Sequence, residues 1–209
     1  MTLRSLRIAD DPNLWQSVGF ALTDDRCVIG GVELELVGAS DARTESESAI
    51  LGWTLDGEWP GEIDGIPTTS QVASEPIRQG AASPNGAVSL DHLVISTPDL
   101  DRTIDALIGA GFELRRIREI GRGMRQAFFW AGDVILEIVG PQGDPGPSRL
   151  WGLAFNTADL NATAAFLGDC CTTPKDAVQR GRRIASLTRE CGVAVPIAFM
   201  TPHTSSSPG

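Results

Sequence analysis

The order of apolar and polar residues predicts a chain made mainly of short strands, and residues 134–141 form the clearest of them. Side chains alternate between the two faces of a strand, so Glu137 shares one face with apolar neighbours while the other face is apolar throughout. Burying an unpaired carboxylate is costly unless it is protonated, hydrogen-bonded or bound to a cation. We therefore expect Glu137 to lie inside the protein with a partner.

The same strand occurs earlier in the chain. Residues 32–38 match residues 134–140 at five of seven positions, with an offset of 102 that aligns Glu35 with Glu137. A Gly-Phe-x-Leu sequence precedes both copies in the same order. This pattern indicates two copies of one supersecondary unit.

Residues 88–141 predict a complete βαβββ unit. A strand at 88–96 leads to a helix that begins at the Thr-Pro-Asp sequence of residues 97–99 and ends at Gly109 and Gly111. The remaining three strands are predicted at 112–120, 124–130 and 134–139.

This unit is then repeated. Residues 90–107 share seven identities with residues 150–167 at an offset of 60, and the closing strand at 134–141 returns at 195–202 with one residue of drift. Two tandem units are enough to curl two small sheets around one pocket. The predicted fold class is therefore α+β, with repeated βαβββ modules forming cupped mixed sheets.

The N-terminal third is a less regular copy, with one unit and a truncated second. Its predicted elements are a helix at 13–18 and strands at 3–8, 21–22, 27–29, 32–37 and 50–55, while residues 56–70 show only turn residues. Residues 71–86 are rich in Ser, Pro, Gly and Ala, which is typical of a linker. We expect a degenerate copy of the repeat at 1–80, a linker at 81–87, a paired βαβββ domain at 88–203 and a disordered tail at 204–209.

Composition narrows the class of partner. The 209 residues carry a net charge of −10 and a pI near 4.6, which argues against nucleic acid and anionic membranes as partners and favours a small molecule. No apolar run reaches the ~18 residues of a membrane span, and the start of the chain lacks a signal sequence, so we expect a cytoplasmic protein. The spacing of the four cysteines favours free thiols.

The order of these elements resembles the vicinal oxygen chelate superfamily, which includes glyoxalase I, bleomycin-resistance proteins and extradiol dioxygenases. The likeness is carried by residues 90–95, 97–101 and 136–141 and by the Gly-Phe step at 111–112. The resemblance implies paired units that hold one divalent metal beside an open coordination position, with a His from a first strand and a Glu from a last strand.

His92 and Glu137 stand at the positions where this resemblance would put metal ligands. An imidazole and a carboxylate suit Zn, Ni, Mn or Fe, and such a metal polarises substrate oxygens as a Lewis acid. The last unit departs from the pattern, because Gly152 and Ala198 occupy the corresponding positions and offer no ligand. A catalytic metal ordinarily has three protein ligands.

Three arrangements would complete a metal site. Counted along the chain, residues 88–141 are the third unit and their repeat is the fourth. In the first arrangement, the first and third units pair and Glu35 joins His92 and Glu137. In the second, two chains each donate His92 and Glu137 across a homodimer axis, and in the third, His203 folds back. The short connection at 142–148 instead favours pairing of the third and fourth units, which leaves two ligands. A cavity without metal therefore stands as the alternative.

The resemblance leaves two main functions open. One is a metal-dependent isomerase, lyase or dioxygenase that acts on a small oxygenated metabolite, with Glu137 also moving a proton. The other is a metal-free protein that sequesters a small molecule, as bleomycin-resistance proteins do, and the acidic composition suggests a cationic drug. A dimer with a filled pocket and a structural or regulatory role is a third hypothesis.

Further residues are candidates for contact with a ligand, although each has an ordinary structural interpretation. Arginines on adjacent strands suit an ion pair with Glu137, basic residues near 175–183 suit a solvated strand edge, and tryptophans suit the core. His92 likewise suits a core histidine. The candidate substrate-binding residues are Arg125, Trp130, Trp151, Lys175 and Arg182.

Overall fold

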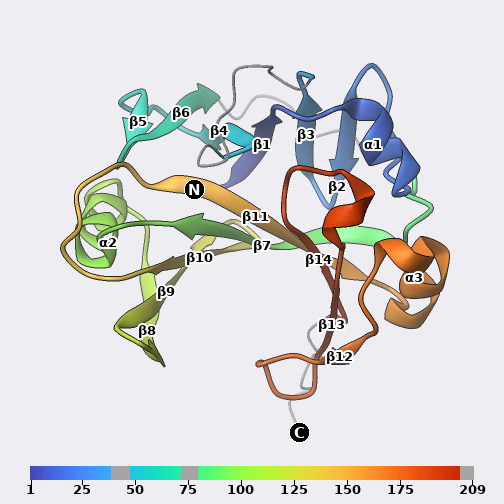
Figure 1. The fold of residues 1–209 in the computed structure, drawn as a ribbon. Coiled ribbons are helices and arrows are strands. Elements are labelled where there is room, and N and C mark those ends of the chain that lie inside the picture. Colours follow the sequence, from blue (N-terminus) through green and yellow to red (C-terminus); the bar gives the residue numbers. More distant parts are fainter. Residues whose placement is uncertain (39–47, 72–79, 203–209) are drawn as a thin grey trace, which may run out of the picture.

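The computed structural model describes residues 1–38, 48–71 and 80–202, and within them the chain forms two mixed sheets (Figure 1). One sheet has eight strands in the order β12-β13-β14-β11-β7-β10-β9-β8, and the other has six in the order β2-β3-β1-β4-β6-β5. The tail expected at 204–209 and His203 lie outside the described residues. No helix in the described ranges is long and apolar enough to cross a membrane.

Half of the eight-stranded sheet is the βαβββ unit that we call the third unit. Strand β7 pairs in parallel with β10, which pairs antiparallel with β9, and β9 pairs antiparallel with β8 at the edge. The elements are β7 (Ala87–Ser96), α2 (Leu100–Gly109), β8 (Leu114–Gly121), β9 (Met124–Ala131) and β10 (Val134–Gly140).

The other half is the fourth unit, which repeats this order. Strand β11 pairs in parallel with β14, and β13 and β12 follow to the opposite edge. The elements are β11 (Arg149–Thr157), α3 (Leu160–Leu167), η1 (Gly168–Cys170), β12 (Lys175–Asp176), β13 (Arg183–Ser186), η2 (Arg189–Cys191) and β14 (Ile197–Met200). Because β7 and β11 pair antiparallel, the two units form one sheet, and the predicted α+β fold of repeated modules is confirmed.

Each of the two central strands carries a β-bulge at the same place in its unit. One extra residue, Asp91 in β7 and Trp151 in β11, stands between two register pairs without a partner opposite. The flanking pairs are Leu90–Phe155, His92–Ala154, Leu150–Ile95 and Gly152–Val94. Asp91 and Trp151 are equivalent positions of the sequence repeat, so the two units also match in the position of their bulges.

Aspartates start both long helices. Asp99 accepts a hydrogen bond from the backbone of Arg102, and Asp159 accepts hydrogen bonds from the backbones of Asn161 and Ala162. Such N-caps satisfy amide groups that have no partner within the helix. The two helices therefore begin at equivalent positions, directly after β7 and β11.

The six-stranded sheet is built from shortened units. β1 pairs in parallel with β3, but only β2 follows β3 to the edge, and β4, β6 and β5 have no helix among them. The elements are β1 (Leu3–Ile8), α1 (Pro12–Ser17), β2 (Arg26–Ile29), β3 (Val32–Leu36), β4 (Ile50–Asp56), β5 (Glu62–Ile63) and β6 (Ile66–Gln71). The strand predicted at 21–22 is absent, and the two strands between 62 and 71 were missed because turn residues dominate that sequence.

One continuous core joins the two sheets. Leu6 and Leu34 of the small sheet and Leu93 and Phe155 of the large one are fully buried in the same cluster. In Figure 1 the small sheet lies above β7 and β11, with α2 and α3 at the two ends of the large sheet, whose edge strands extend away from it. The small sheet therefore covers the face of the large sheet that also carries the helices.

A buried carboxylate links the N-terminal part to the fourth unit. Asp10 is 3% exposed and accepts hydrogen bonds from the indole nitrogen of Trp15 at 3.0 Å and the backbone nitrogen of Ala194 at 2.8 Å. Ala194 lies in the loop between η2 and β14. This contact fixes the loop to the helix that follows β1.

Candidate functional site

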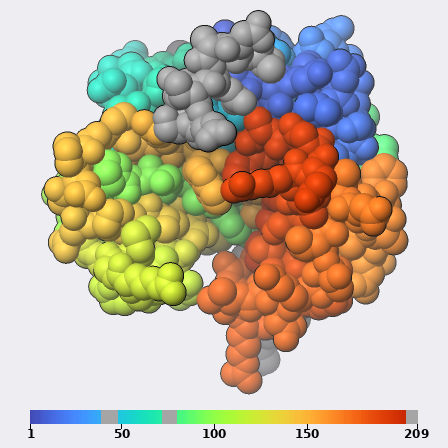
Figure 2. Space-filling model, in the orientation of Figure 1, coloured from blue at the N-terminus to red at the C-terminus, as the bar shows by residue number. Residues whose placement is uncertain are grey.

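The face of the large sheet that lacks helices lines a cavity of about 1540 Å³. Strands β7 to β11, the short strands of the fourth unit and the loop before β14 all contribute residues to its wall. Figure 2 shows the hollow between the third and fourth units, coloured green to yellow and orange to red. The volume exceeds the roughly 300–1,000 Å³ of ordinary ligand pockets, so a ligand larger than a small metabolite has room here.

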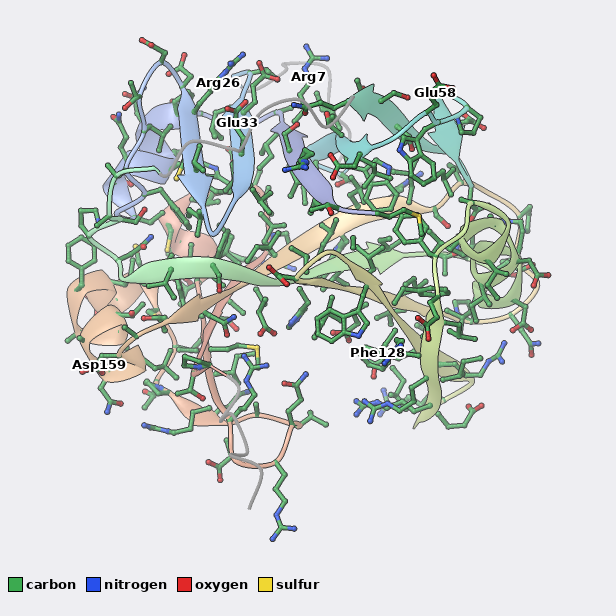
Figure 3. All side chains as sticks on the ribbon, turned by 180° about the vertical axis from the view of Figure 1, so that it is seen from behind. Arg7, Arg26, Glu33, Glu58, Phe128 and Asp159 are labelled. Atoms are coloured by element: carbon green, nitrogen blue, oxygen red, sulfur yellow. The ribbon has the colours of Figure 1, made fainter. Side chains whose placement is uncertain are left out.

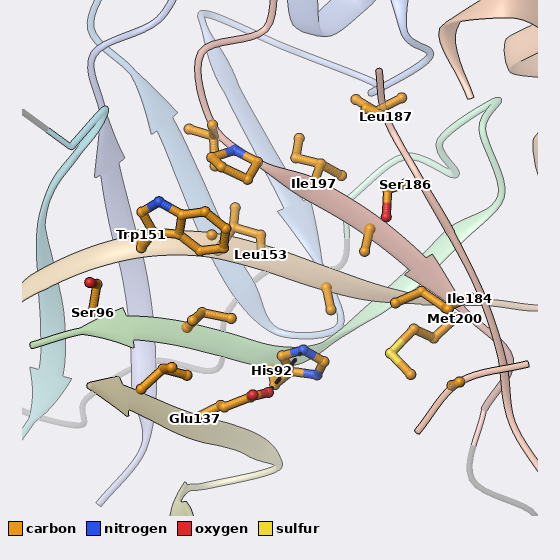
Figure 4. A pocket seen from close by; sticks show the side chains of 18 of the residues that line it. His92, Ser96, Glu137, Trp151, Leu153, Ile184, Ser186, Leu187, Ile197 and Met200 are labelled. Atoms are coloured by element: carbon orange, nitrogen blue, oxygen red, sulfur yellow. Dashed lines mark ion pairs between the residues drawn. The ribbon is translucent and has the colours of Figure 1, made fainter. Parts of the chain in front are cut away.

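His92 and Glu137 meet in this cavity. They lie on the neighbouring parallel strands β7 and β10, where Ile135 is the register partner of His92, and the Nε2 atom of His92 is 3.5 Å from the Oε2 atom of Glu137. Figure 4 shows the two side chains pointing toward each other. The predicted convergence of this pair is therefore present in the fold.

Asp91 holds the other side of the imidazole. The Nδ1 atom of His92 lies 2.9 Å from a carboxylate oxygen of Asp91, and the bulge allows these two consecutive residues to meet. Burial raises the pKa of the Asp91 carboxyl, but the hydrogen bond with His92 and the Arg182 guanidinium outweigh burial and lower that pKa to about 2. Asp91 is consequently ionised at neutral pH.

Arg182 is the ionic partner of Asp91 and is itself only 3% exposed. Its two terminal nitrogens donate to the two carboxylate oxygens at 2.9 and 3.1 Å, a bidentate geometry that suits arginine. The guanidinium also donates to the backbone oxygen of Thr201 at 2.7 Å and to the side chain of Asn156 at 2.8 Å. The fourth unit thus supplies the group that fixes Asp91 of the third unit.

The position of protons around His92 follows from these neighbours. An ionised carboxylate only accepts hydrogen bonds, so Nδ1 of His92 carries the proton that faces Asp91. Nε2 then faces the Glu137 carboxylate at 3.5 Å inside the cavity.

Glu137 has a second neighbour, the amide of Gln126, which donates to its Oε1 atom. The side-chain oxygen of Gln126 in turn accepts a hydrogen bond from Arg118. No arginine pairs directly with Glu137 among the described residues, and Arg125, a candidate for that role, pairs with Asp101 at 2.7 Å instead. Glu137 therefore faces the cavity with a neutral donor on one side and an imidazole on the other.

The donor set falls short of a resident catalytic metal. Across residues 1–38, 48–71 and 80–202 no three His, Cys, Asp or Glu side chains gather closely enough to hold a metal ion. His92 and Glu137 are two donors, whereas catalytic sites ordinarily have three, and Gly152 and Ala198 line the same cavity without a donor side chain. The described residues of one copy of the chain therefore do not fit a metal held in the implied manner.

Glu35 is not brought to the pair. It lies on β3 in the six-stranded sheet, where it accepts a hydrogen bond from Arg26 at 2.9 Å. Figure 3 shows Arg26 and Glu33 of that sheet on the side of the molecule opposite Phe128 of the cavity wall. The reason is topological, because the third unit shares its sheet with the fourth and not with the first.

The candidate substrate-binding residues divide into two groups. Trp151 and Lys175 line the cavity. Arg182 is buried behind the site against Asp91, and neither Arg125 nor Trp130 is part of the cavity wall. Sequence reasoning missed Asp91, whose position depends on the bulge, and it missed the role of Arg182 as its partner.

Comparisons with known proteins add similarities of fold. No family model matches the chain, and no curated protein matches it. Among solved structures it is similar to methylmalonyl-CoA epimerase from Mycobacterium tuberculosis, with 22% identity over 57% of this chain and 91% of that one and a TM-score of 0.47. It is also similar to Streptomyces coelicolor methylmalonyl-CoA epimerase in complex with 2-nitronate-propionyl-CoA (24% identity, 58% and 99% coverage, TM-score 0.46).

A hypothetical protein from Bacillus halodurans is similar at 16% identity, with 57% and 98% coverage and a TM-score of 0.47. These scores are too low to carry the activity of the epimerases to this chain. The topology of the chain itself, two βαβββ units joined through β7 and β11 into one cupped sheet, is the arrangement that the sequence resemblance implied. The fold is therefore a cupped sheet of two repeated βαβββ units, as the sequence predicted.

Proposed function

We propose that this protein is an enzyme that moves a proton on a small molecule bound in the cup, with Glu137 and His92 as the acid–base pair. One observation carries the proposal: Asp91 and Arg182 fix the imidazole of His92 so that Nε2 faces Glu137 inside the cavity. Of the reactions suggested by the family resemblance, isomerisation and elimination use such a pair.

Each residue has a distinct role in this mechanism. Glu137 accepts a proton from a carbon next to a carbonyl group, and His92 holds or returns a proton through Nε2. Asp91 touches no reacting atom and is a positioning residue that fixes the orientation and tautomer of the imidazole. Gln126 donates to Glu137 and holds its carboxylate against rotation.

The proposal is tested by proton exchange in heavy water. The protein is incubated with a panel of 2-oxo acids and acyl thioesters, and loss of the carbon-bound proton is followed by NMR. Glu137→Gln should slow exchange by about 10²–10⁴-fold, the usual contribution of a positioned base. Glu35→Gln is a matched control, since it alters the same position of the duplicated strand outside the cavity, and it should leave exchange unchanged.

Metal analysis supplies the independent check. Purified protein should contain no stoichiometric Zn, Ni, Mn or Fe, because His92 and Glu137 alone make an incomplete ligand set. Stoichiometric metal that disappears in His92→Ala would contradict the metal-free mechanism. Loss of exchange equally in Glu137→Gln and Glu35→Gln would contradict the role of Glu137.

A metal-free binding protein is the second candidate. The observation in its favour is the part of the cavity wall that the fourth unit forms. Gly152 and Ala198 stand there where the family resemblance would put metal ligands. Apolar side chains such as Leu153 and Ile197 also line the cavity. A binder raises its melting temperature with ligand but exchanges no proton. The exchange assay therefore separates the two functions.

A further inference from the structure

Among the described residues, the cavity wall carries a charge opposite to that of the chain. Acidic residues outnumber basic ones by 27 to 17 over the sequence. Within the described residues the cavity wall carries five basic side chains but only two acidic ones, Glu137 and Asp176. The basic residues are Arg116, Arg118, Arg149, Lys175 and Arg189. The acidic composition thus does not describe the surface that a ligand meets, and a cationic drug is not favoured there.

Two of these cations form a built surface on β8. Arg116 and Arg118 are two residues apart, so both project from the same face of the strand. Their guanidinium carbons lie 4.9 and 6.0 Å from the ring centroid of Phe128 on the neighbouring strand. The aromatic ring limits the directions that the two side chains take and holds two positive charges side by side.

Neither guanidinium is neutralised. In the part of the chain that the structure describes, Arg116 and Arg118 have no carboxylate within 4.0 Å, and Arg118 donates only to the amide oxygen of Gln126. Arg115, which directly precedes Arg116 and does not line the cavity, pairs instead with Glu113 at 2.6 Å. The cup face of β8 therefore presents two positive charges that an incoming anion can engage.

The surface lies next to the proposed acid–base pair. Arg118 binds Gln126, and Gln126 binds Glu137, so two successive hydrogen bonds separate the cationic pair from the base. Across the cavity, the fourth unit offers an apolar wall that includes Leu153, Ile197 and Met200. A ligand held at β8 by a charged group can lay an uncharged body against this wall.

We propose that the ligand is an organic anion whose oxyanionic group, a carboxylate or a phosphate, binds Arg116 and Arg118 while its apolar body crosses the cavity toward the fourth unit. This assignment deepens the proposed function by naming the class of its substrate. Planar guanidinium groups bind both kinds of oxyanion through paired hydrogen bonds, so the two head groups share one recognition chemistry.

The test uses two fluorescent probes that differ in charge. 8-Anilinonaphthalene-1-sulfonate is an aromatic anion, and N-phenyl-1-naphthylamine is its uncharged counterpart. The double variant R116Q/R118Q should weaken binding of the anionic probe by at least about tenfold and leave the neutral probe nearly unchanged. R115Q is the matched control, because it removes the same charge from the same strand outside the cavity, and it should change neither.

Competition identifies the head group. 4-Phenylbutyrate, 4-phenylbutyl phosphate and 4-phenylbutanol have the same body, and each is titrated against the bound anionic probe. Displacement by either anion at a concentration at least about tenfold below that of the alcohol supports the proposal, and the stronger anion names the head group. Raising NaCl from ~0.05 to ~0.5 M should weaken direct binding of the anionic probe and leave binding of the neutral probe nearly unchanged.

Three results would overturn the assignment. They are equal loss of both probes in R116Q/R118Q, equal loss of the anionic probe in R115Q, or displacement by the alcohol as readily as by the anions. Circular dichroism and melting temperature confirm that each variant is folded. Glu137→Gln should still bind the anionic probe, so failure of the acid–base mechanism and failure of anion recognition give different outcomes.

Discussion

The third and fourth units share one topology and differ in what they place on it. Both have a β-bulge at the same point, but the third unit fills it with Asp91 and the fourth with Trp151, and His92 and Glu137 face Gly152 and Ala198 across the pseudo-symmetric sheet. The third unit therefore carries the His92–Glu137 pair, whereas the fourth has no ionisable side chain at these two positions and adds apolar side chains to the cavity wall. The two units therefore have equivalent strand pairings but differ in the side chains that they place in the cavity.

The division is not complete, because the two halves meet at one buried ion pair. Arg182, from the turn before β13, binds Asp91 from β7. The fourth unit gave no ligand to the cavity, yet its guanidinium fixes the histidine of the third unit. The site consequently depends on the pairing of the two units.

The largest expected effect is the loss of that ion pair. Arg182→Met should destabilise the protein by about 3–5 kcal/mol, because it removes the cationic partner of the ionised, buried Asp91. Urea unfolding measures the change. The double variant R182M/D91L should recover much of the loss, since removing both charges also removes the penalty for burying one of them.

An equally small loss in the single and double variants would show that the ion pair does not hold the halves together. Arg183→Met is a suitable control. Arg183 neighbours Arg182 in sequence but donates to Asn161 and to the backbone of Pro174, with no carboxylate partner within 4.0 Å in the described ranges. Its substitution should cost less than about 1 kcal/mol.

The next effect is a loss of stability in acid. The folded state holds the pKa of Asp91 at about 2, below that of an unfolded aspartate, so this group stabilises the fold above pH 4 and loses that contribution as pH falls toward 2. A shift of this size corresponds to about 2–3 kcal/mol at neutral pH. Urea unfolding between pH 5 and pH 2.5 measures it.

Asp91→Asn should reduce the slope of the unfolding free energy against pH in this range by the contribution of about one proton. If the variant and the wild type lose stability with the same slope, Asp91 is not the group that titrates. A direct titration of the aspartate carboxyl carbons by NMR gives the same answer without a substitution.

The smallest effect comes from returning a donor to the fourth unit. Ala198 lines the cavity and is connected to His92 through the register partner that both share, Ala154. Ala198→Glu adds a third donor and should tighten binding of Zn²⁺ by about tenfold or more. Calorimetry measures the affinity, and Ala198→Gln, which has the same shape without the charge, is the control.

Equal zinc affinity in the two Ala198 variants would mean that the halves of the cup stand too far apart to share a metal. Gly152 is a poorer position for the same test. A Cβ atom there would lie 3.1 Å from the backbone oxygen of Pro196, closer than most real contacts, so a side chain requires the neighbouring strand to move. The packing of the fourth unit against Gly152 therefore leaves little space for a ligand side chain at this position.

Much of the C-terminal fold follows from the sequence, because periodicity, capping aspartates and repeated strands are local signals. Residues 88–141 and their copy were predicted to form two βαβββ units, and the strand order confirms them. Alternation also placed Glu137 on a face of β10, and it lines the cavity as expected. These features require only the side-chain pattern of one segment at a time.

The parts that were missed depend on contacts between distant segments. The bulge at Asp91 reverses the alternation of β7, and nothing in residues 88–96 distinguishes it from a regular strand. Arg182 lies 91 positions from Asp91, so their pairing appears only in the folded chain. The sequence was sufficient to predict the cationic pair on β8, because Arg116 and Arg118 share one face of a predicted strand.

Asp10 gives the N-terminal third a role that its own sheet does not reveal. Its carboxylate binds the backbone of Ala194, and residues 193–196 form part of the cavity wall. The N-terminal part, which has no helix among β4, β5 and β6, thus supports a loop in the cavity wall of the fourth unit. A substitution at Asp10, just after β1, should therefore alter the shape of the cavity without contact with a bound molecule.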